Sequence, residues 1–326
     1  MTGATGAIGY RVVQALHDAG YAVRTLSIDA PRARLFPDSV ESYVGDVTDA
    51  AAVMSAMRNV DTVIHLAALL HVVNPPATLR SEYERVNVGG TQIVVDAAIQ
   101  LGVRRLVLFS TIAVYGPSQG DVLTEDSVPR PDTYYAQTKL AAESIVLGAR
   151  RADRKPLGTV LRLGAVYGPR IKGNYQRLLH SLARGRFVPI GTGLNRRTLV
   201  YDKDAAAATV LAMQHPAAAG RIYNVSDGEF HTLNEIIAAM CAALGRRPPR
   251  LSLPAGPVRL VAGILEDAGR LVGQPSPFVR ATVDKYTEDI AVSSRRIQIE
   301  LGFAPEYGLA AGWQETVAEL RRTGEI

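Results

Sequence analysis

Short apolar runs alternate with stretches of helical periodicity along the first half of the chain. Strand-like runs occupy residues 21–28, 40–44, 62–66 and 105–110. Apolar positions with helical spacing occupy residues 10–16, 50–57 and 81–101. Strands separated by helices are typical of a parallel sheet that is covered on both faces. We therefore predict an α/β fold with a doubly wound parallel sheet.

The pattern changes after about residue 166, where helical stretches and loops dominate. A strand-like run and a helix at residues 195–215 are expected to return to the sheet, and another helix is predicted for residues 233–244. The chain thus divides into a nucleotide-binding domain at residues 1–165 and a smaller C-terminal lobe, mainly residues 166–326, that we expect to bind substrate.

An apolar stripe with nearly helical spacing runs through Val258, Val261, Leu265 and Val272. Such a stripe can lie on a membrane or at a dimer interface. Packing against the C-terminal lobe is the default expectation, because most amphipathic helices bury their apolar side in their own domain.

Composition narrows the classes of function. The chain has 326 residues, is 47% apolar, and has no apolar run of about 18 residues, so we expect no membrane span. The single cysteine, Cys241, excludes an intramolecular disulfide and a cysteine-cluster metal site, and fits the cytoplasm. The net charge of +5 is spread along the chain, which favours small anionic ligands and not nucleic acid.

A glycine-rich loop opens the chain, with glycines at positions 3, 6 and 9 directly before a helical stretch. This spacing allows a tight turn and a close approach of the backbone to a pyrophosphate at a helix N-terminus. A βαβ unit also needs a strand before the loop, about five or six residues long, and only Met1 and Thr2 precede Gly3 here. We therefore expect the true start to lie upstream of Met1, or the chain to have been trimmed.

Three polar side chains can converge at the carboxyl end of the strand at residues 105–110. Thr111 follows that strand, where ligands bind in open α/β sheets. Tyr135 and Lys139 are four residues apart, so a helix would place them on one face. An ammonium in that position is expected to lower the pKa of the phenol, so that Tyr135 can act as a base.

The order of motifs resembles the extended short-chain dehydrogenase/reductases, in the NAD-dependent epimerase/dehydratase group. The matching segments run along nearly the whole chain: TGATGAIG at 2–9, GDV at 45–47, HLAA at 65–68, NVGGT at 87–91, ST at 110–111, VYG at 114–116, YAQTK at 135–139, LR at 161–162, VYGP at 166–169, RTLVYDKD at 197–204 and YNV at 223–225. The resemblance implies a Rossmann-type fold.

The resemblance also implies a role for each matching position. Gly3, Gly6, Ile8 and Gly9 would hold the pyrophosphate of the dinucleotide, Asp46 and Val47 the adenine, and Leu66, Ala67 and Ala68 the ribose and nicotinamide side. A turn or N-cap role for Asp46 is an equally good interpretation. His65 is expected to be a satisfied core histidine, and Asn87 an architectural residue beneath the site.

The choice between NAD and NADP is open from the sequence. Relatives that prefer NAD usually have an acidic residue at the end of the second strand, to bind the ribose diol. That position is Ser27 here, with Asp29 two residues later, and Arg32 and Arg34 could pair with a 2′-phosphate. The family as a whole favours NAD, with NADP as the alternative.

In the mechanism that the resemblance implies, Tyr135 takes a proton from a substrate hydroxyl as hydride leaves that carbon, while Lys139 lowers the phenol pKa and holds the nicotinamide ribose. Thr111 would hydrogen-bond the reacting hydroxyl. Ser110 and Tyr134 compete for these roles but lack the family position and the spacing to Lys139. Related dehydratases place an Asp-Glu pair directly after the threonine, and Ile112 and Ala113 stand there instead.

The resemblance implies a nucleotide-activated sugar as substrate, with epimerisation or reduction at C4. Arg197 occupies the position of an arginine that binds the sugar nucleotide's diphosphate. Gly164 and Ala165 fill a region where relatives often have a substrate-binding asparagine, which weakens this assignment. A reductase of a non-sugar carbonyl or hydroxysteroid-like alcohol, and a non-catalytic dinucleotide sensor, are the alternatives. The family habit of pairing two helices per subunit suggests a homodimer.

Overall fold

A parallel β-sheet lies at the centre of the protein, which we describe from a computed structural model covering residues 1–70, 78–271 and 279–326. The strands lie side by side in the order β2, β1, β3, β4, β5 and β9, with Thr2 bridging β1 to β3. Every pairing in this sheet is parallel. The strands are β1 (Arg24–Ser27), β2 (Glu41–Val44), β3 (Thr62–His65), β4 (Arg105–Thr111), β5 (Gly158–Leu163) and β9 (Ile222–Val225).

Met1 and Thr2 join the two parts of the sheet. The Met1 amino group donates to the Arg24 carbonyl at 2.7 Å, and the Thr2 amide donates to the Ile64 carbonyl at 2.9 Å. The glycine loop therefore starts from the middle of the sheet, between β1 and β3.

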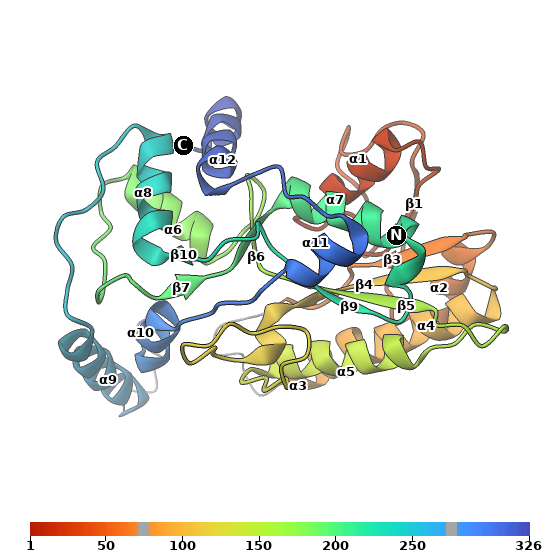
Figure 1. The fold of residues 1–326 in the computed structure, drawn as a ribbon, viewed down its shortest axis with the longest axis horizontal. Coiled ribbons are helices and arrows are strands. Elements are labelled where there is room, and N and C mark those ends of the chain that lie inside the picture. The colour runs from red at the N-terminus through yellow and green to blue at the C-terminus, as the bar shows by residue number, and fades with distance from the viewer. Residues whose placement is uncertain (71–77, 272–278) are drawn as a thin grey trace.

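Helices cover both faces of the sheet, as the alternating pattern predicts (Figure 1). One face is covered by α1 (Gly9–Asp18), α7 (Asp202–Gln214) and α11 (Arg295–Leu301), and the other by α2 (Ala50–Met57), α4 (Gly90–Gln100) and α5 (Tyr134–Gly148). The apolar side chains of the first three helices pack with β4 and β5 in one core cluster, and those of the other three helices form a second cluster on the opposite face. The predicted α/β fold with a doubly wound parallel sheet is confirmed.

The helix predicted for residues 81–101 is not uniform. It consists of α3 (Leu79–Tyr83), a π-helical turn η1 (Glu84–Gly89) and α4. The π turn holds Asn87 in the interior, where its side chain bonds the backbone of Leu69 and the hydroxyl of Thr138. Asn87 thus links the segment after β3 to helix α5, and its predicted architectural role agrees with these bonds.

The C-terminal lobe has its own apolar core around Trp313, which stacks on Tyr167 with ring centroids 4.6 Å apart. The predicted helix at 233–244 is α8 with those bounds, because Thr232 and Glu235 form a capping box at its start and Gly245 ends it in the left-handed conformation. The other elements of this part are β6 (Ala165–Tyr167), α6 (Asn174–Ala183), β7 (Arg196–Arg197), β8 (Leu199–Tyr201), β10 (His231–Thr232), α9 (Ala255–Leu271), α10 (Arg280–Thr287) and α12 (Leu309–Thr323).

The packing predicted for the apolar stripe at residues 258–272 is wrong in part. Helix α9 lies at the outer edge of the lobe (Figure 1) and contacts α10. Val261 and Leu265 are 53% and 47% exposed, whereas Ala262 and Gly263 are buried. A Cβ at Gly263 would overlap the Arg280 guanidinium, so the small side of α9 packs inward. Val272 lies outside the described residues.

Candidate active site

The glycine loop fits the backbone of a dinucleotide. Gly3 has φ +72°, and a Cβ there would lie 2.7 Å from the Ala67 amide nitrogen. A Cβ at Gly9 would overlap the Ala4 carbonyl, which lets α1 begin close against the loop. No side chain caps the N-terminus of α1, and the amides of Gly9 and Arg11 donate to the carbonyls of Gly6 and Ile8. Binding of a phosphate at this helix N-terminus stays a prediction. The structure thus brings Gly3 next to Leu66 and Ala67. The roles of Gly3, Gly6, Ile8 and Gly9 with a dinucleotide stay predictions.

Replacing Gly9 with alanine tests this packing. We expect Gly9→Ala to lower the free energy of unfolding by about 1–3 kcal/mol, because the added methyl group forces the loop and the helix apart, and to weaken NAD binding. Chemical denaturation and calorimetric titration with NAD measure the two effects. Gly148→Ala is the matched control, because a Cβ there meets nothing within 4 Å. Equal behaviour of the two variants would contradict the close approach.

Asp46 follows β2 and shapes a turn. Its Oδ1 accepts a hydrogen bond from the Thr48 amide at 2.9 Å, and Oδ2 lies 3.4 Å from the Arg85 guanidinium. Burial raises the pKa of Asp46, but the bonds from Thr48 and Arg85 outweigh it and hold the pKa below its ordinary value. The turn interpretation of Asp46 matches this geometry, and its role with adenine stays a prediction. The neighbouring Val47 is buried against Gly90.

The residues that could select between NAD and NADP differ in their surroundings. Ser27 is buried at the end of β1, and its hydroxyl accepts a hydrogen bond from the Thr5 amide at 3.3 Å. Ser27 therefore supports the glycine loop. Asp29, Arg32 and Arg34 are all exposed in the segment after β1.

Helix α5 carries the predicted catalytic pair. It begins at Tyr134, and the Thr133 hydroxyl caps it by accepting from the Ala136 amide at 3.2 Å. Lys139 is buried on the side of α5 that packs against β4, and Tyr135 is partly buried one turn earlier. The Tyr134 hydroxyl instead donates to Glu84 at 2.8 Å, so Tyr134 is directed away toward η1. The choice of Tyr135 over Tyr134 is consistent with these contacts.

The expected lowering of the Tyr135 pKa is wrong for this structure. Burial raises the pKa of Tyr135 to about 12, and the neighbouring Tyr83 phenol adds to the effect. Burial also lowers the pKa of Lys139 to about 8, although Glu143 opposes this. Spacing along a helix predicts which residues meet, but it does not report how deeply they are buried, and burial has the larger effect here. Burial therefore favours the protonated phenol of Tyr135 in this structure.

Thr111 ends β4, at the carboxyl edge of the sheet. Its Oγ1 accepts a hydrogen bond from the Ala113 amide at 3.1 Å, so the O–H can still donate. Ser110 is buried, and its hydroxyl donates to Oε1 of Glu143 beneath the site. This contact uses the Ser110 hydroxyl in the interior and leaves Thr111 as the hydroxyl at the strand end. Helix α5 packs on both β4 and the 3-10 turn η2 (Ile112–Tyr115), which brings together the elements that carry Thr111, Tyr135 and Lys139.

A buried ion pair supports this region, and the sequence analysis missed it. Nε of Arg162 on β5 donates to Oε1 of Glu143 at 3.0 Å, and Nη2 donates to Oε2 at 2.6 Å. The Arg162 guanidinium also lies over the Tyr115 ring, 4.7 Å from its centroid, and the Tyr115 hydroxyl donates to Asn224. Two features of the sequence could have indicated this pair: Glu143 is charged and lies four positions after Lys139, and Arg162 lies inside an apolar strand.

His65 is a core histidine, as expected. Its Nδ1 lies 2.7 Å from the Thr2 hydroxyl and its Nε2 lies 3.0 Å from the Thr91 hydroxyl. Burial lowers the pKa of His65 to about 3, and the positive charge of Lys139 adds to this. The imidazole is therefore neutral in the folded protein.

This burial predicts a pH dependence of stability. The unfolded chain protonates His65 below its ordinary pKa of 6.5, whereas the folded chain does not until about 3. The contribution of His65 is therefore complete above pH 6.5 and is lost at about 1.4 kcal/mol per pH unit as the pH falls through that window. Denaturation at pH 7 and pH 5 should show a smaller decrease for His65→Gln. The same decrease in both proteins would contradict a buried neutral imidazole.

Arg197 makes contacts within the protein. Its Nη2 donates to the backbone carbonyls of Lys285 and Tyr286, at 2.6 and 3.0 Å, and Nη1 lies 4.0 Å from Glu288. Arg197 thus anchors α10 to the lobe. Binding of a substrate diphosphate by Arg197 stays a prediction. The guanidinium would then bind the diphosphate and these protein partners at the same time.

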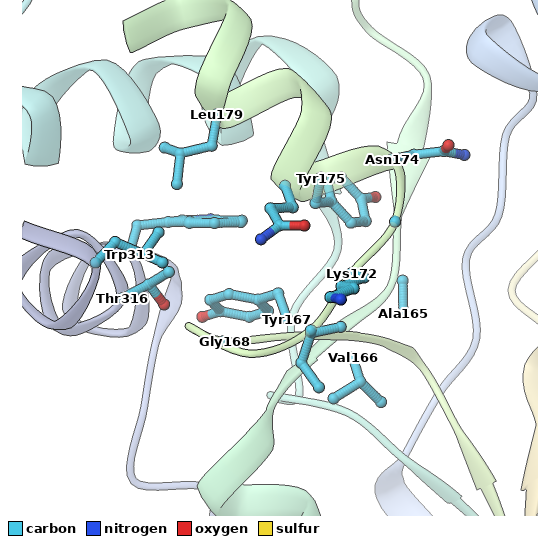
Figure 2. Close-up of a pocket in the computed structure, with 14 residues that line it drawn as sticks. Ala165, Val166, Tyr167, Gly168, Lys172, Asn174, Tyr175, Leu179, Trp313 and Thr316 are labelled. Atoms are coloured by element: carbon cyan, nitrogen blue, oxygen red, sulfur yellow. The ribbon is translucent and has the colours of Figure 1, made fainter. Parts of the chain in front are cut away.

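A cavity of about 210 Å³ lies in the C-terminal lobe. Figure 2 shows the rings of Tyr167, Tyr175 and Trp313 around it, with Ala165 at its border. Gly164 lies outside it, where a Cβ would be 3.0 Å from the Thr198 carbonyl oxygen. A side chain at position 164 would therefore press on the Thr198–Leu199 backbone. The lining contains none of the predicted catalytic residues.

Three comparisons with known proteins bear on this arrangement. Residues 1–226 match the model of the NAD dependent epimerase/dehydratase family. The chain belongs to this family. Its predicted dependence on NAD is confirmed at the level of the family.

This chain is similar to individual members of the family over nearly its whole length. UDP-glucose 4-epimerase from Vibrio cholerae is 28% identical over 97% of this chain and 93% of its own. dTDP-glucose 4,6-dehydratase from Streptomyces griseus is 32% identical over 98% of this chain and 92% of its own. The structure of MoeE5 in complex with UDP-glucuronic acid and NAD has a TM-score of 0.77 at 29% identity, covering 99% and 98% of the two chains.

Among the described residues, no helix is both long and apolar enough to cross a membrane.

Proposed function

We propose that this family member oxidises or reduces C4 of a nucleotide-activated sugar with NAD, as a 4-epimerase or a 4-ketoreductase. The observation that carries this proposal is that Thr111 ends β4 and that Tyr135 and Lys139 lie one turn apart on α5, which packs against β4. Similarity to proteins whose names and titles include UDP-sugars supports the class of substrate.

Each of these residues has a distinct task. The Thr111 hydroxyl donates to the substrate oxygen and holds it beside the Tyr135 phenol. Tyr135 gives a proton to that oxygen during reduction and takes one back during oxidation. Lys139 provides positive charge near the phenol and binds a ribose hydroxyl of the cofactor. Bound NAD would accept hydride in the oxidation, and NADH would return it in the reduction. Gly3, Gly6, Ile8 and Gly9 would hold its pyrophosphate, and Leu66, Ala67 and Ala68 would lie at the ribose and nicotinamide side.

Elimination of water across C5 and C6 is not part of this proposal. That reaction needs an acid and a base beyond the Tyr135 phenol, and the positions after Thr111 hold Ile112 and Ala113. Neither side chain can transfer a proton. The similarity to a dTDP-glucose 4,6-dehydratase therefore supports the scaffold and the class of substrate, and the side chains at 112 and 113 favour redox chemistry at one carbon.

Substrate screening tests the proposal. Ligands that bind only the folded state raise its melting temperature, so we expect NAD and at least one UDP- or dTDP-sugar to do so. Interconversion of UDP-glucose and UDP-galactose without added cofactor would identify an epimerase, and stoichiometric NADPH or NADH consumption with a 4-keto sugar a reductase. Turnover of a non-sugar carbonyl or hydroxysteroid alone would overturn the substrate class, and NAD binding without turnover of any of these compounds would favour a sensor.

We further propose that the protein works in the cytoplasm and as a homodimer. The single cysteine, buried in α8, suits a reducing compartment. Light scattering at micromolar concentration measures the mass in solution, and a monomer across the working range would contradict the dimer.

A further inference from the structure

An exposed apolar surface lies on helix α9, at the edge of the C-terminal lobe (Figure 1). Leu260, Val261, Ile264 and Leu265 follow one another at helical spacing and are 68%, 53%, 61% and 47% exposed. Residues at i, i+1, i+4 and i+5 lie on the same side of a helix. The surface is therefore continuous along two turns of α9, and it faces away from α10.

The chain that leads into α9 carries further exposed apolar side chains. Leu251 and Leu253, in the connection from α8, are 83% and 49% exposed. The segment 246–265 contains four arginines and no acidic residue: Arg246, Arg247, Arg250 and Arg259. All four are exposed, and among the described residues only Arg259 has an ion-pair partner, Asp284. Segment 246–265 thus contains six large exposed apolar side chains and three arginines that have no ion-pair partner among the described residues.

The two acidic residues of α9, Glu266 and Asp267, form ion pairs with an arginine of α10. Arg280 on α10 lies across the small residues of α9, where its Nη2 pairs with Asp267 at 2.7 Å and its Nη1 lies 3.4 Å from Glu266. This arrangement directs the negative charges of α9 toward α10. The outward side of α9 is left apolar, and the basic segment precedes it in the chain.

We propose that residues 246–265 bind the surface of an anionic lipid bilayer, with α9 lying in the plane of the interface. An exposed apolar helix side next to arginines is the combination that binds such surfaces, since apolar side chains enter the acyl boundary and guanidinium groups meet lipid phosphates. A second copy of the chain is the weaker candidate, because a symmetric interface would bring the same arginines together without acidic partners.

The position of α9 connects this surface to the candidate active site. Helix α10, which packs on α9, gives its Lys285 and Tyr286 carbonyls to Arg197, the predicted diphosphate ligand. Binding through α9 would therefore orient the substrate lobe toward the bilayer. The proposal itself does not depend on the reaction, since it rests on the exposed side of α9 and the charge of segment 246–265.

Vesicle sedimentation of the full chain tests the proposal. We expect the protein to sediment with vesicles that contain phosphatidylglycerol and to stay in solution with pure phosphatidylcholine, with binding weakened by salt. The double variant Val261→Ser/Ile264→Ser should bind at least about tenfold less tightly, as should Arg247→Gln/Arg250→Gln. Ile299→Ser on α11, where the side chain is 70% exposed, is the control and should bind like the parent protein.

Two outcomes would overturn the proposal. The first is binding to phosphatidylglycerol vesicles that Val261→Ser/Ile264→Ser leaves unchanged, because α9 would then not enter the interface. The second is absence of vesicle binding together with a dimer that the same double variant dissociates, because a second copy would then cover this surface. Far-ultraviolet circular dichroism and turnover of each variant establish that the fold is retained.

Discussion

Tyr135→Phe is expected to reduce turnover by about 10²–10⁴-fold while the protein still folds and binds NAD. The phenol is the only group that the proposal asks to exchange a proton with the substrate oxygen. Because burial raises its pKa to about 12, Tyr135 holds a proton that phenylalanine cannot supply. The loss should fall on kcat, with a small change in KM, since the ring and its packing near Tyr83 remain.

Tyr134→Phe is the matched control for this prediction. It removes a hydroxyl from the adjacent residue, where the hydroxyl donates to Glu84 and not to the site. We expect nearly normal turnover from this variant. Steady-state kinetics of both variants decide the assignment, because full turnover by Tyr135→Phe, or equal losses in the two proteins, would show that Tyr135 is not the proton-transferring group.

Glu143→Ala is expected to lower the free energy of unfolding by about 3–5 kcal/mol. The substitution leaves the Arg162 guanidinium buried without its carboxylate and also removes the acceptor of the Ser110 hydroxyl. A buried charge without a partner costs far more than an exposed one, because water cannot replace the lost interaction. Urea or guanidinium denaturation measures the change.

The exposed ion pair between Asp61 and Arg104 provides the comparison. Its side chains are 74% and 69% exposed, so Asp61→Ala should change the free energy of unfolding by about 1 kcal/mol or less. If Glu143→Ala were no more destabilising than Asp61→Ala, the Glu143–Arg162 pair would not hold β5 and α5 together. Replacing both partners with apolar residues should recover part of the loss, since the unpaired charge is then gone.

Much of the fold follows from local patterns. The alternation of strands and helices predicts the parallel sheet, and the bounds of α8 agree with the sequence because Thr232, Glu235 and Gly245 are strong local end signals. The assignment of His65 to the core also follows from its place in an apolar strand. These features are determined by residues that are close in sequence, so they can be predicted from the sequence pattern.

Other features depend on contacts between distant residues. The apolar side of α9 could be seen in the sequence, but its exposure depends on Arg280 taking the opposite side. The pKa of Tyr135 depends on burial and on Tyr83, fifty-two positions earlier. The pairing of Glu143 with Arg162 requires α5 to pack on β5, and this packing cannot be predicted from the spacing of residues along the chain. A charge of +5 for the whole chain likewise conceals the acid-free segment 246–265.

The most direct test of the proposed function uses UDP-glucose carrying deuterium at C4. The account predicts that deuterium moves between C4 and the nicotinamide, is recovered at C4 of the epimer or on the dinucleotide, and slows turnover relative to unlabelled substrate, with no transfer in Tyr135→Phe. The same measurement on other C4-labelled nucleotide sugars covers the rest of the class. Deuterium lost to water, or product formed by Tyr135→Phe at the rate of the parent protein, would contradict the account.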